Sequence, residues 1–240
     1  MSKSLMFHYN GRRLKTWNPI TGCYHYCIYC WARRLVEKRL KNITKKYAEG
    51  FKPKFHPQEL SKRFKPGDFV FVCDVGDMFG RWVPEEWILK VLNHISKFPK
   101  TTFLLLTKNP ERFFEFEDVL KRLHNIVLGA TIETDFSLLY MEHRISNAPI
   151  PQRRIKAMAE LGSKGFRIML SIEPILDFSS LFSTIIAEII SPDFVYIGYD
   201  NYGNRLPEPP LIKTMELIRE LREHGITVYT KTLRKAWFEK

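Results

Sequence analysis

Three of the four cysteines lie within eight residues of the chain, with the spacing Cys-x3-Cys-x2-Cys. They are Cys23, Cys27 and Cys30. Three thiolates on one short loop can hold three corners of a four-iron, four-sulfur (4Fe–4S) cluster, which leaves one iron open for an outside ligand. The stretch therefore predicts an iron-sulfur site with a reactive open iron.

Two other interpretations of the cysteine loop stay open. Zinc could bind the three thiolates together with His25, although structural zinc sites usually combine two separated ligand pairs. No second pair of the type Cys-x2-Cys or His-x3-His follows in the chain. In the zinc case the chain would be a zinc-stabilised nucleic-acid-binding module without catalysis. The cysteines could also be merely buried or oxidised, with no metal at all.

The cysteine stretch also resembles the signature of a known family. Its spacing, with Tyr29 directly before the last cysteine, is similar to the motif of the radical S-adenosylmethionine (SAM) superfamily. Within that superfamily the chain resembles a phage-protein-type subfamily whose function is not established. This resemblance spans residues 16–200 and is carried by the segments 16–23, 71–80, 103–112 and 170–175.

The resemblance implies an enzyme with two cofactors, a 4Fe–4S cluster and SAM. In that superfamily the amino and carboxylate groups of SAM chelate the open iron, and reductive cleavage of SAM gives a 5′-deoxyadenosyl radical. The resemblance also implies an electron donor such as a reductase, a flavodoxin or a ferredoxin. It does not imply a substrate.

The length and composition indicate one large α/β domain. With 240 residues, 45% of them hydrophobic, the chain can bury a sizeable core, and we expect a single domain over residues 1–240. We expect no contact with a membrane, because no apolar run reaches about 18 residues and residues 1–13 lack the apolar core of a signal peptide. Clustered thiols suit a reducing compartment, which predicts a cytoplasmic protein.

Positive charge is concentrated around the cysteine loop. Residues 1–66 hold 16 Lys and Arg against three acidic residues, whereas the rest of the chain holds 22 against 23. A phosphate-rich partner is one explanation, which makes a nucleic acid a candidate substrate that binds through the basic residues 33–65. A solvated Lys-rich face is the other. The aromatic residues beside the cysteines could shield a cluster from water or stack on a base.

Short apolar runs alternate with amphipathic helical stretches along the chain. Continuous runs without polar alternation indicate strands that are buried on both faces, hence a parallel sheet covered by helices. The βαβα order with right-handed crossovers favours a barrel-like arrangement, and the resemblance sharpens this to a partial (β/α)6 TIM-like barrel with one added strand. The expected strands are 14–20, 69–73, 103–107, 126–131, 166–171, 194–199 and 226–230, and clear helices are expected at 84–98 and 211–221.

Polar residues follow these strands at their C-terminal ends, where barrels of this type carry their chemistry. In the superfamily, a Gly-Gly-Glu-like turn after the second strand holds the amino group of SAM through backbone carbonyls. This chain departs from that pattern, so the atom that makes the contact stays open. The residues expected to bind SAM are Asp74, Gly76, Asp77, Thr131 and Glu133, and those expected to be catalytic are Lys108 and Glu173.

Each of these residues also has a purely structural interpretation. Asp and Gly make ordinary turns, Lys108 could be solvated, and Glu133 could stabilise the start of the following helix. Glu173 is the stronger candidate, because a carboxylate at an apolar strand end needs a partner. Cys73, alone in an apolar run, is expected in the core.

Overall fold

The structure is a computed structural model that describes residues 7–10 and 12–240. Residues 1–6 and 11 lie outside the described residues. They make up much of the segment 1–13, for which the sequence predicts no signal peptide. Within the described part of the chain, no helix is both long enough and apolar enough to cross a membrane.

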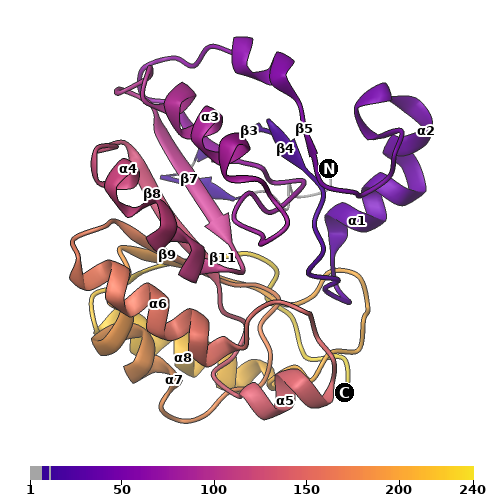
Figure 1. The fold of residues 1–240 in the computed structure, drawn as a ribbon. Coiled ribbons are helices and arrows are strands. Elements are labelled where there is room, and N and C mark those ends of the chain that lie inside the picture. The colour runs from indigo at the N-terminus through magenta and orange to yellow at the C-terminus, as the bar shows by residue number, and fades with distance from the viewer. Residues whose placement is uncertain (1–6, 11) are drawn as a thin grey trace.

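Seven parallel strands form one sheet that curls into a half-barrel (Figure 1). Each strand pairs with the next one of the sheet along the chain, which is the strand order of a barrel and not of a doubly wound sheet. The predicted partial TIM-like barrel with one added strand is thus confirmed. The strands are β3 (Lys15–Trp17), β6 (Phe69–Val72), β7 (Thr102–Thr107), β8 (Ile126–Thr131), β9 (Ile168–Ile172), β10 (Phe194–Ile197) and β11 (Thr227–Thr230).

Helices cover the outer face of the sheet, as right-handed crossovers require. Two small antiparallel pairs complete the described structure, formed by β1 (His8–Tyr9) with β2 (Arg12–Arg13) and by β4 (Ile20–Thr21) with β5 (Lys54–Phe55). The helical elements are α1 (Trp31–Leu35), η1 (Val36–Leu40), α2 (Lys41–Ile43), η2 (Lys45–Tyr47), η3 (Pro57–Ser61), α3 (Glu85–Ile95), η4 (Pro110–Phe116), α4 (Glu117–Lys121), α5 (Ser137–Glu142), α6 (Pro151–Ser163), α7 (Phe182–Thr184), η5 (Ile185–Ile190) and α8 (Leu211–Glu223).

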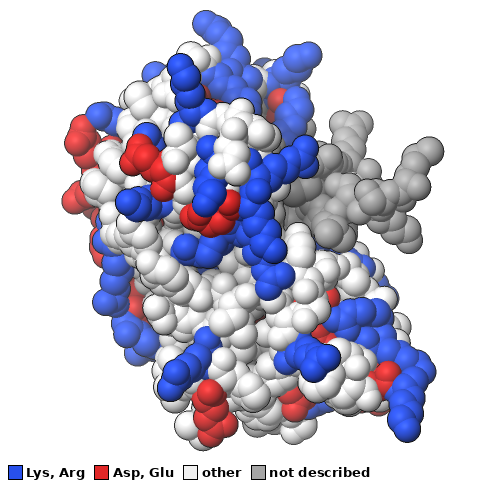
Figure 2. All heavy atoms as spheres, turned by 90° about the vertical axis from the view of Figure 1, so that its right-hand side faces the viewer, with Lys and Arg blue, Asp and Glu red and all other residues white. Residues whose placement is uncertain are grey.

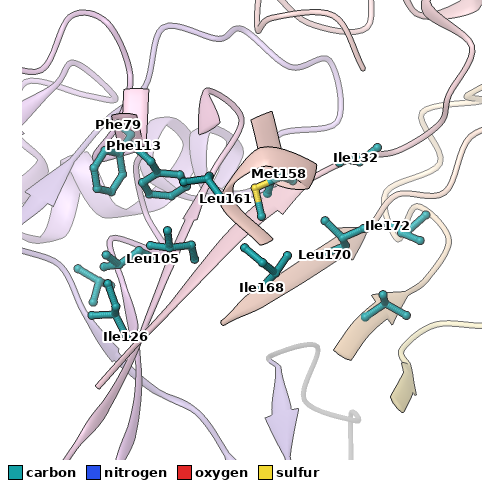
Figure 3. Close-up of a cluster of buried hydrophobic side chains, with 14 of the residues drawn as sticks. Phe79, Leu105, Phe113, Ile126, Ile132, Met158, Leu161, Ile168, Leu170 and Ile172 are labelled. Carbon is teal, nitrogen blue, oxygen red and sulfur yellow. The ribbon is translucent and has the colours of Figure 1, made fainter. Parts of the chain in front are cut away.

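Successive residues of each strand alternate between two apolar layers. In β7, Phe103 and Leu105 pack against the outer helices, whereas Leu104 and Leu106 face the inside of the half-barrel. Strand β9 alternates in the same way. Figure 3 shows part of the outer layer, in which Met158 and Leu161 of α6 lie over side chains of the sheet. This double burial explains why the strands read as continuous apolar runs.

Aromatic side chains fill the half-barrel from the N-terminal ends of its strands, where Tyr9 packs on Phe69 and Phe194, up to the floor of a cavity. Phe7 packs on Phe71 and Tyr196, with ring centroids 5.5 and 4.4 Å apart, respectively. The Tyr196 hydroxyl donates a hydrogen bond to the His8 carbonyl at 2.6 Å. This end of the interior is therefore packed with rings, and the C-terminal end is left for this cavity.

Candidate functional site

A cavity of about 510 Å³ opens at the C-terminal ends of the strands, beside the cysteine loop. It is lined by side chains from the loop, from the ends of most strands of the sheet and from the segment after β10. Its volume lies in the range of small-molecule sites. Nine of the ten residues that we predict for the site line it, namely Cys23, Cys27, Cys30, Asp74, Gly76, Asp77, Lys108, Thr131 and Glu173.

The alternation of the strands explains why most of these side chains face the cavity. Lys108 continues the inward-facing series of Leu104 and Leu106, and Glu173 continues that of Met169 and Ser171. Side chains two residues apart in a strand share a face. The apolar interior of the half-barrel therefore becomes polar where the strands end.

Two of the three cysteine sulfurs of the loop accept a backbone hydrogen bond, and the third lies beside a hydroxyl. The backbone N–H of His25 donates to Cys23 Sγ at 3.4 Å, and that of Arg33 donates to Cys30 Sγ at 3.3 Å. Cys27 Sγ lies 3.2 Å from the Ser146 hydroxyl. All three thiols are free of disulfides. Such contacts stabilise thiolate ligands and tune the metal that they hold.

The ring of His25 is engaged away from the three cysteines. Among the described residues, no group of three or more His, Cys, Asp or Glu side chains could hold one metal ion. The ring of His25 bonds instead to Asp77, with Nε2 3.0 Å from Oδ2. Burial raises the pKa of the Cys23 and Cys27 thiols.

Two glycines let the cysteine loop lie directly on the turn after β6. Gly22 bridges to Gly76, and its N–H donates to the Val75 carbonyl at 2.9 Å. A Cβ on Gly76 would lie 3.0 Å from the Cα of Thr21 and 3.1 Å from the nitrogen of Gly22. Gly76 therefore serves the close approach of the two backbones.

A second segment braces the loop from the other side. The N–H of Ile28 donates to the Ile145 carbonyl at 3.1 Å, and the N–H of Asn147 donates to the His25 carbonyl at 2.7 Å. The Ser146 hydroxyl donates to the same carbonyl at 2.9 Å. Residues 145–147, which follow α5, thus fix the loop at Cys27.

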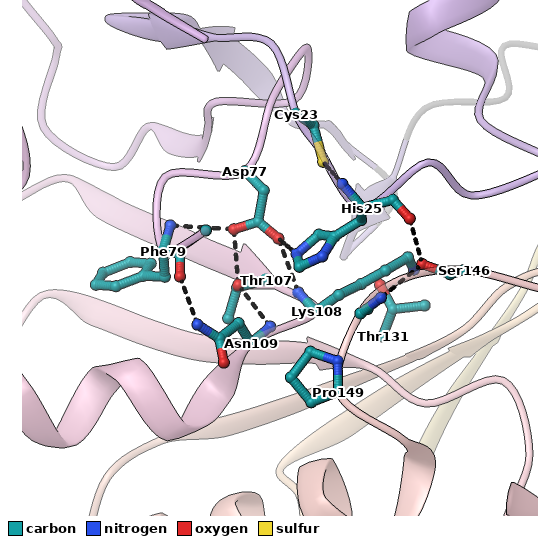
Figure 4. A network of polar contacts seen from close by, with 12 residues as sticks. Cys23, His25, Asp77, Phe79, Thr107, Lys108, Asn109, Thr131, Ser146 and Pro149 are labelled. Carbon is teal, nitrogen blue, oxygen red and sulfur yellow. Dashed lines mark hydrogen bonds and ion pairs between the residues drawn. The ribbon is translucent and has the colours of Figure 1, made fainter. Parts of the chain in front are cut away.

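The Asp77 carboxylate joins the cysteine loop to the ends of β6 and β7 (Figure 4). Its Oδ1 accepts hydrogen bonds from the Thr107 hydroxyl at 2.7 Å and from the Phe79 N–H at 3.0 Å. Its Oδ2 accepts from the Lys108 N–H and contacts the His25 ring, both at 3.0 Å. Burial works to raise its pKa, but these contacts outweigh burial and lower it.

The turn after β6 is held by the side chain of Asn18, which our sequence reasoning did not single out. Asn18 Nδ2 donates to Asp74 Oδ1 at 2.5 Å, and Asn18 Oδ1 accepts from the Val75 N–H at 3.0 Å. Asp74 and Gly76 both line the cavity, and the Asp77 carboxylate accepts several hydrogen bonds from the protein.

Glu133 does not line the cavity. It is fully buried behind the wall, where Arg154 Nη1 lies 2.6 Å from its Oε2 and Lys108 Nζ lies 3.2 Å from its Oε1. The Tyr29 hydroxyl also donates to Oε1. Burial would raise the pKa of Glu133, but Arg154 and Lys108 outweigh it and lower the pKa to about 2. The residue is the anion of a buried ionic network and does not cap a helix.

Lys108 is held by this network at the edge of the cavity. Its side chain is only 13% exposed, and its ammonium lies 5.2 Å from the centre of the Tyr29 ring. Burial raises the pKa of the Cys27 thiol, and the Lys108 ammonium partly offsets that rise. Lys108 is therefore an oriented cation beside the loop, not a solvated one.

Glu173 has the partner that a buried carboxylate needs. Lys231 Nζ lies 2.6 Å from Glu173 Oε2, and both side chains are nearly buried. Burial raises the pKa of Glu173, and the Lys231 ammonium counteracts that shift. Gly198 makes room for the pair, since a Cβ there would lie 3.1 Å from the Cβ of Lys231. Our sequence reasoning missed Lys231, although it directly follows a predicted strand.

Positive charge gathers on the face that carries α1, η1 and α2, as the blue side chains in the upper half of Figure 2 show. Part of it is used within the protein. Arg33 Nη2 donates to the Cys23 carbonyl at 2.7 Å, and its guanidinium lies over the rings of Tyr26 and Phe51. Within residues 33–65, the exposed cations that form no ion pair with the described residues are Lys38, Arg39, Lys45, Lys52, Lys62, Arg63 and Lys65.

Comparison with protein-family models identifies one match, which covers residues 13–189 and is described as a protein of unknown function (DUF5131). None of the curated protein sequences matches this chain. The matched region contains the cysteine loop and every residue predicted for the site.

Solved structures show the same fold at low sequence identity. A double mutant of spore photoproduct lyase with bound AdoMet and dinucleoside spore photoproduct aligns with a TM-score of 0.54 and 10% identity, over 97% of this chain and 81% of that one. A single mutant of the same lyase gives 0.57 and 11%, over 95% and 80%. Streptococcus suis SuiB bound to S-adenosylmethionine gives 0.54 and 13%, over 90% of this chain and 46% of SuiB.

Proposed function

The chain belongs to the DUF5131 family of proteins of unknown function, and we propose that it is a radical SAM enzyme. The observation that carries the proposal is the convergence of three free thiols and several strand-end polar groups on one cavity. The similar folds of spore photoproduct lyase and SuiB, which are radical SAM enzymes, support it.

In this proposal Cys23, Cys27 and Cys30 hold a 4Fe–4S cluster at the mouth of the half-barrel. When bound, the cluster supplies an electron to SAM, whose reductive cleavage gives a 5′-deoxyadenosyl radical. The chain contributes the three thiolates and the backbone N–H groups that face two of them. It also contributes a packed interior that keeps water from the strand side of the cavity.

The strand-end residues would orient SAM between the loop and the sheet. We propose that Asp74 and the backbone of Gly76 receive its amino group, that Thr131 contacts it from β8, and that the Lys108 ammonium faces its carboxylate. Asp77 and Glu133 would hold these residues in position and would not contact SAM themselves, because their carboxylates already bond to other groups of the protein. Glu173 and Lys231 lie on the remaining wall and would face the substrate.

We propose a nucleic acid as the substrate class. The exposed cations of residues 38–65 would neutralise its phosphates, and they lie on the segments that follow the cysteine loop. The solved lyase structure contains a dinucleoside spore photoproduct, which is consistent with this class. An acidic electron-transfer protein such as a flavodoxin or a ferredoxin would supply the reducing equivalents.

Anaerobic reconstitution with iron and sulfide tests the cofactor directly. We expect a brown protein with broad visible absorption and about four irons and four sulfides per chain. A colourless protein that takes up one zinc ion instead would favour the alternative, a zinc-stabilised nucleic-acid-binding module without catalysis. That alternative explains the basic face but gives no role to the polar groups at the strand ends.

A further inference from the structure

Two large aromatic side chains stand exposed at the rim of the cavity. Trp31 directly follows Cys30 at the start of α1 and is 36% exposed, and Tyr202 lies after β10 and is 45% exposed. Both line the cavity, although they come from distant parts of the chain. Exposed aromatic faces beside a polar cavity are the surfaces on which planar ligands stack.

The two sides of this rim are tied together. Arg34 of α1 donates to the side-chain oxygen of Asn204, and its guanidinium lies 5.4 Å from the centre of the Tyr202 ring. Asn204 in turn donates from its backbone and its amide to the Asp200 carboxylate, both at 2.8 Å. The segment that carries Tyr202 is thus fixed to the helix that carries Trp31. The rim exists before any ligand arrives.

The size of the cavity limits what can pass this rim. About 510 Å³ is the size of a small-molecule site. A nucleic-acid double helix is far larger, and its bases are closed to reagents while they are stacked and paired. Enzymes that act on a base therefore take that base out of the stack.

Charge on the outside of the rim matches the rest of such a ligand. Lys38 and Arg39 lie on η1, which continues the helix of Arg34, and both are exposed. Inside, the Glu173–Lys231 pair offers a carboxylate and an ammonium, which suit the mixed acceptors and donors of a base edge. From the outside inwards, the site therefore offers cations, then aromatic rings, and then the polar Glu173–Lys231 pair.

We propose that the group which enters the cavity is a single nucleobase of a nucleic-acid strand, stacked on Trp31 and Tyr202 at the rim while its phosphates lie along Lys38 and Arg39. The inference rests on the proposed function in one respect, since the inserted base is the group that the radical would reach. The inference goes further than the proposed function, because it requires that the bases of the strand contribute to the binding affinity in addition to the phosphates.

Fluorescence anisotropy of labelled single-stranded DNA, measured anaerobically on the SAM-loaded protein, tests this proposal. The two probes are an oligonucleotide with all its bases and an abasic strand of equal length and charge. We expect Trp31→Ala and Tyr202→Ala each to weaken binding of the first probe roughly ten-fold and to leave the second unchanged. Trp31→Phe and Tyr202→Phe should retain most of the affinity. The salt dependence should stay the same in all four variants, because phosphate contacts set it.

Phe238→Ala is the matched control, because this ring is 49% exposed and does not line the cavity. Equal binding of the two probes by the wild-type protein would overturn the proposal, and so would equal losses for both probes in the rim variants. No binding of any strand would also overturn it and would point to a protein or small-molecule substrate. An RNA strand of the same sequence identifies the source, and preference for DNA or for RNA supports the proposal alike.

Failure of the proposed function gives a different result. Iron content and the release of 5′-deoxyadenosine from SAM in the absence of substrate are measured for every variant. A protein that holds no iron yet binds bases through Trp31 and Tyr202 refutes the radical enzyme and keeps the base site. A protein that cleaves SAM but does not distinguish the two probes refutes the base site alone.

Discussion

The three cysteine sulfurs of the loop are contacted by groups from three separate places in the chain. Cys23 and Cys30 receive backbone N–H groups of the loop and of α1, and Cys27 faces the hydroxyl of Ser146. The fourth cysteine, Cys73, lies in the hydrophobic core as expected and is 2% exposed. The four thiols therefore differ in environment, and only three of them line the cavity.

We expect Cys23→Ala, Cys27→Ala and Cys30→Ala each to lose the reconstituted cluster, because two thiolates cannot hold it stably. Iron and sulfide analysis after anaerobic reconstitution measures the loss. Cys73→Ala is the control and should retain full iron, with a small loss of stability for its smaller buried side chain. Iron lost from the Cys73 variant and kept in the others would show that the ligands are assigned wrongly.

Glu133 gives a prediction about stability and its pH dependence. Glu133→Gln leaves Arg154 and Lys108 buried without their anion, so we expect the free energy of unfolding to fall by about 3–5 kcal/mol at pH 7. The folded-state pKa is about 2, below the unfolded value, so the charge stabilises above the unfolded pKa of about 4.3. That stabilisation is lost as the pH falls from about 4.3 towards 2.

Urea unfolding of the cluster-free protein between pH 7 and pH 3 measures this effect. The difference between wild type and Glu133→Gln should narrow as the pH falls. Glu142→Gln, at an exposed residue without an ion pair among the described residues, should differ from wild type by less than about 0.5 kcal/mol. A gap that stays constant with pH would mean that the pKa of Glu133 is the same in the folded and the unfolded protein.

Residues at strand ends could be predicted from the sequence, but their partners could not. The positions of Lys108 and Glu173 follow from strand periodicity and the barrel rule. Arg154 lies inside an ordinary amphipathic helix, and Ser146 lies in an irregular segment, so no local pattern marks either as a neighbour of the site. Their roles depend on contacts between residues far apart in the sequence.

At the scale of elements, the segment from α1 to η3 holds nine Lys and Arg residues against three acidic ones. Its acidic residues are already paired, for example Glu37 with Lys41 and Glu59 with Lys46. Arg33 is part of the packing of the cysteine loop, since it contacts the Cys23 carbonyl and two rings. Changing Arg33 would therefore disturb the cluster site together with the charge, and it is unsuitable for testing a partner.

We expect reversal of the exposed cations Lys38, Arg39, Lys45 and Lys52 to Glu to weaken binding of single-stranded DNA and to flatten its salt dependence. Each lost phosphate contact reduces the log–log slope by about 0.7, so four contacts account for about 3 units. Titrations at several salt concentrations measure the slope, and the cluster content should not change.

A matched variant reverses four exposed cations outside this segment, Lys97, Lys100, Arg122 and Lys156. Its slope should equal that of the wild-type protein. If both variants bind alike, the basic segment is a solvated face, and the charge gives no evidence for a nucleic-acid partner.

At the scale of the whole molecule, the architecture could be predicted almost completely. Buried parallel strands give continuous apolar runs, and six of the seven expected strands are present with small shifts at their ends. The strand expected at 14–20 is shorter, because β3 ends at Trp17 and Ile20 belongs to β4 of a separate pair. The hairpin of β1 and β2 and the rings of Phe7 and Tyr9 inside the half-barrel were not predicted. Two-residue strands leave no periodic signal, and the filling of a barrel end is decided by tertiary packing.

The central claim is that the cavity performs reductive cleavage of SAM. The most direct measurement is anaerobic incubation of the reconstituted protein with dithionite and SAM, followed by chromatographic quantification of 5′-deoxyadenosine and methionine. We expect both products in equal amounts with the wild-type protein and neither with Cys27→Ala. A protein that carries a full cluster and binds SAM but releases no 5′-deoxyadenosine, or a variant that releases as much as wild type, would contradict the claim.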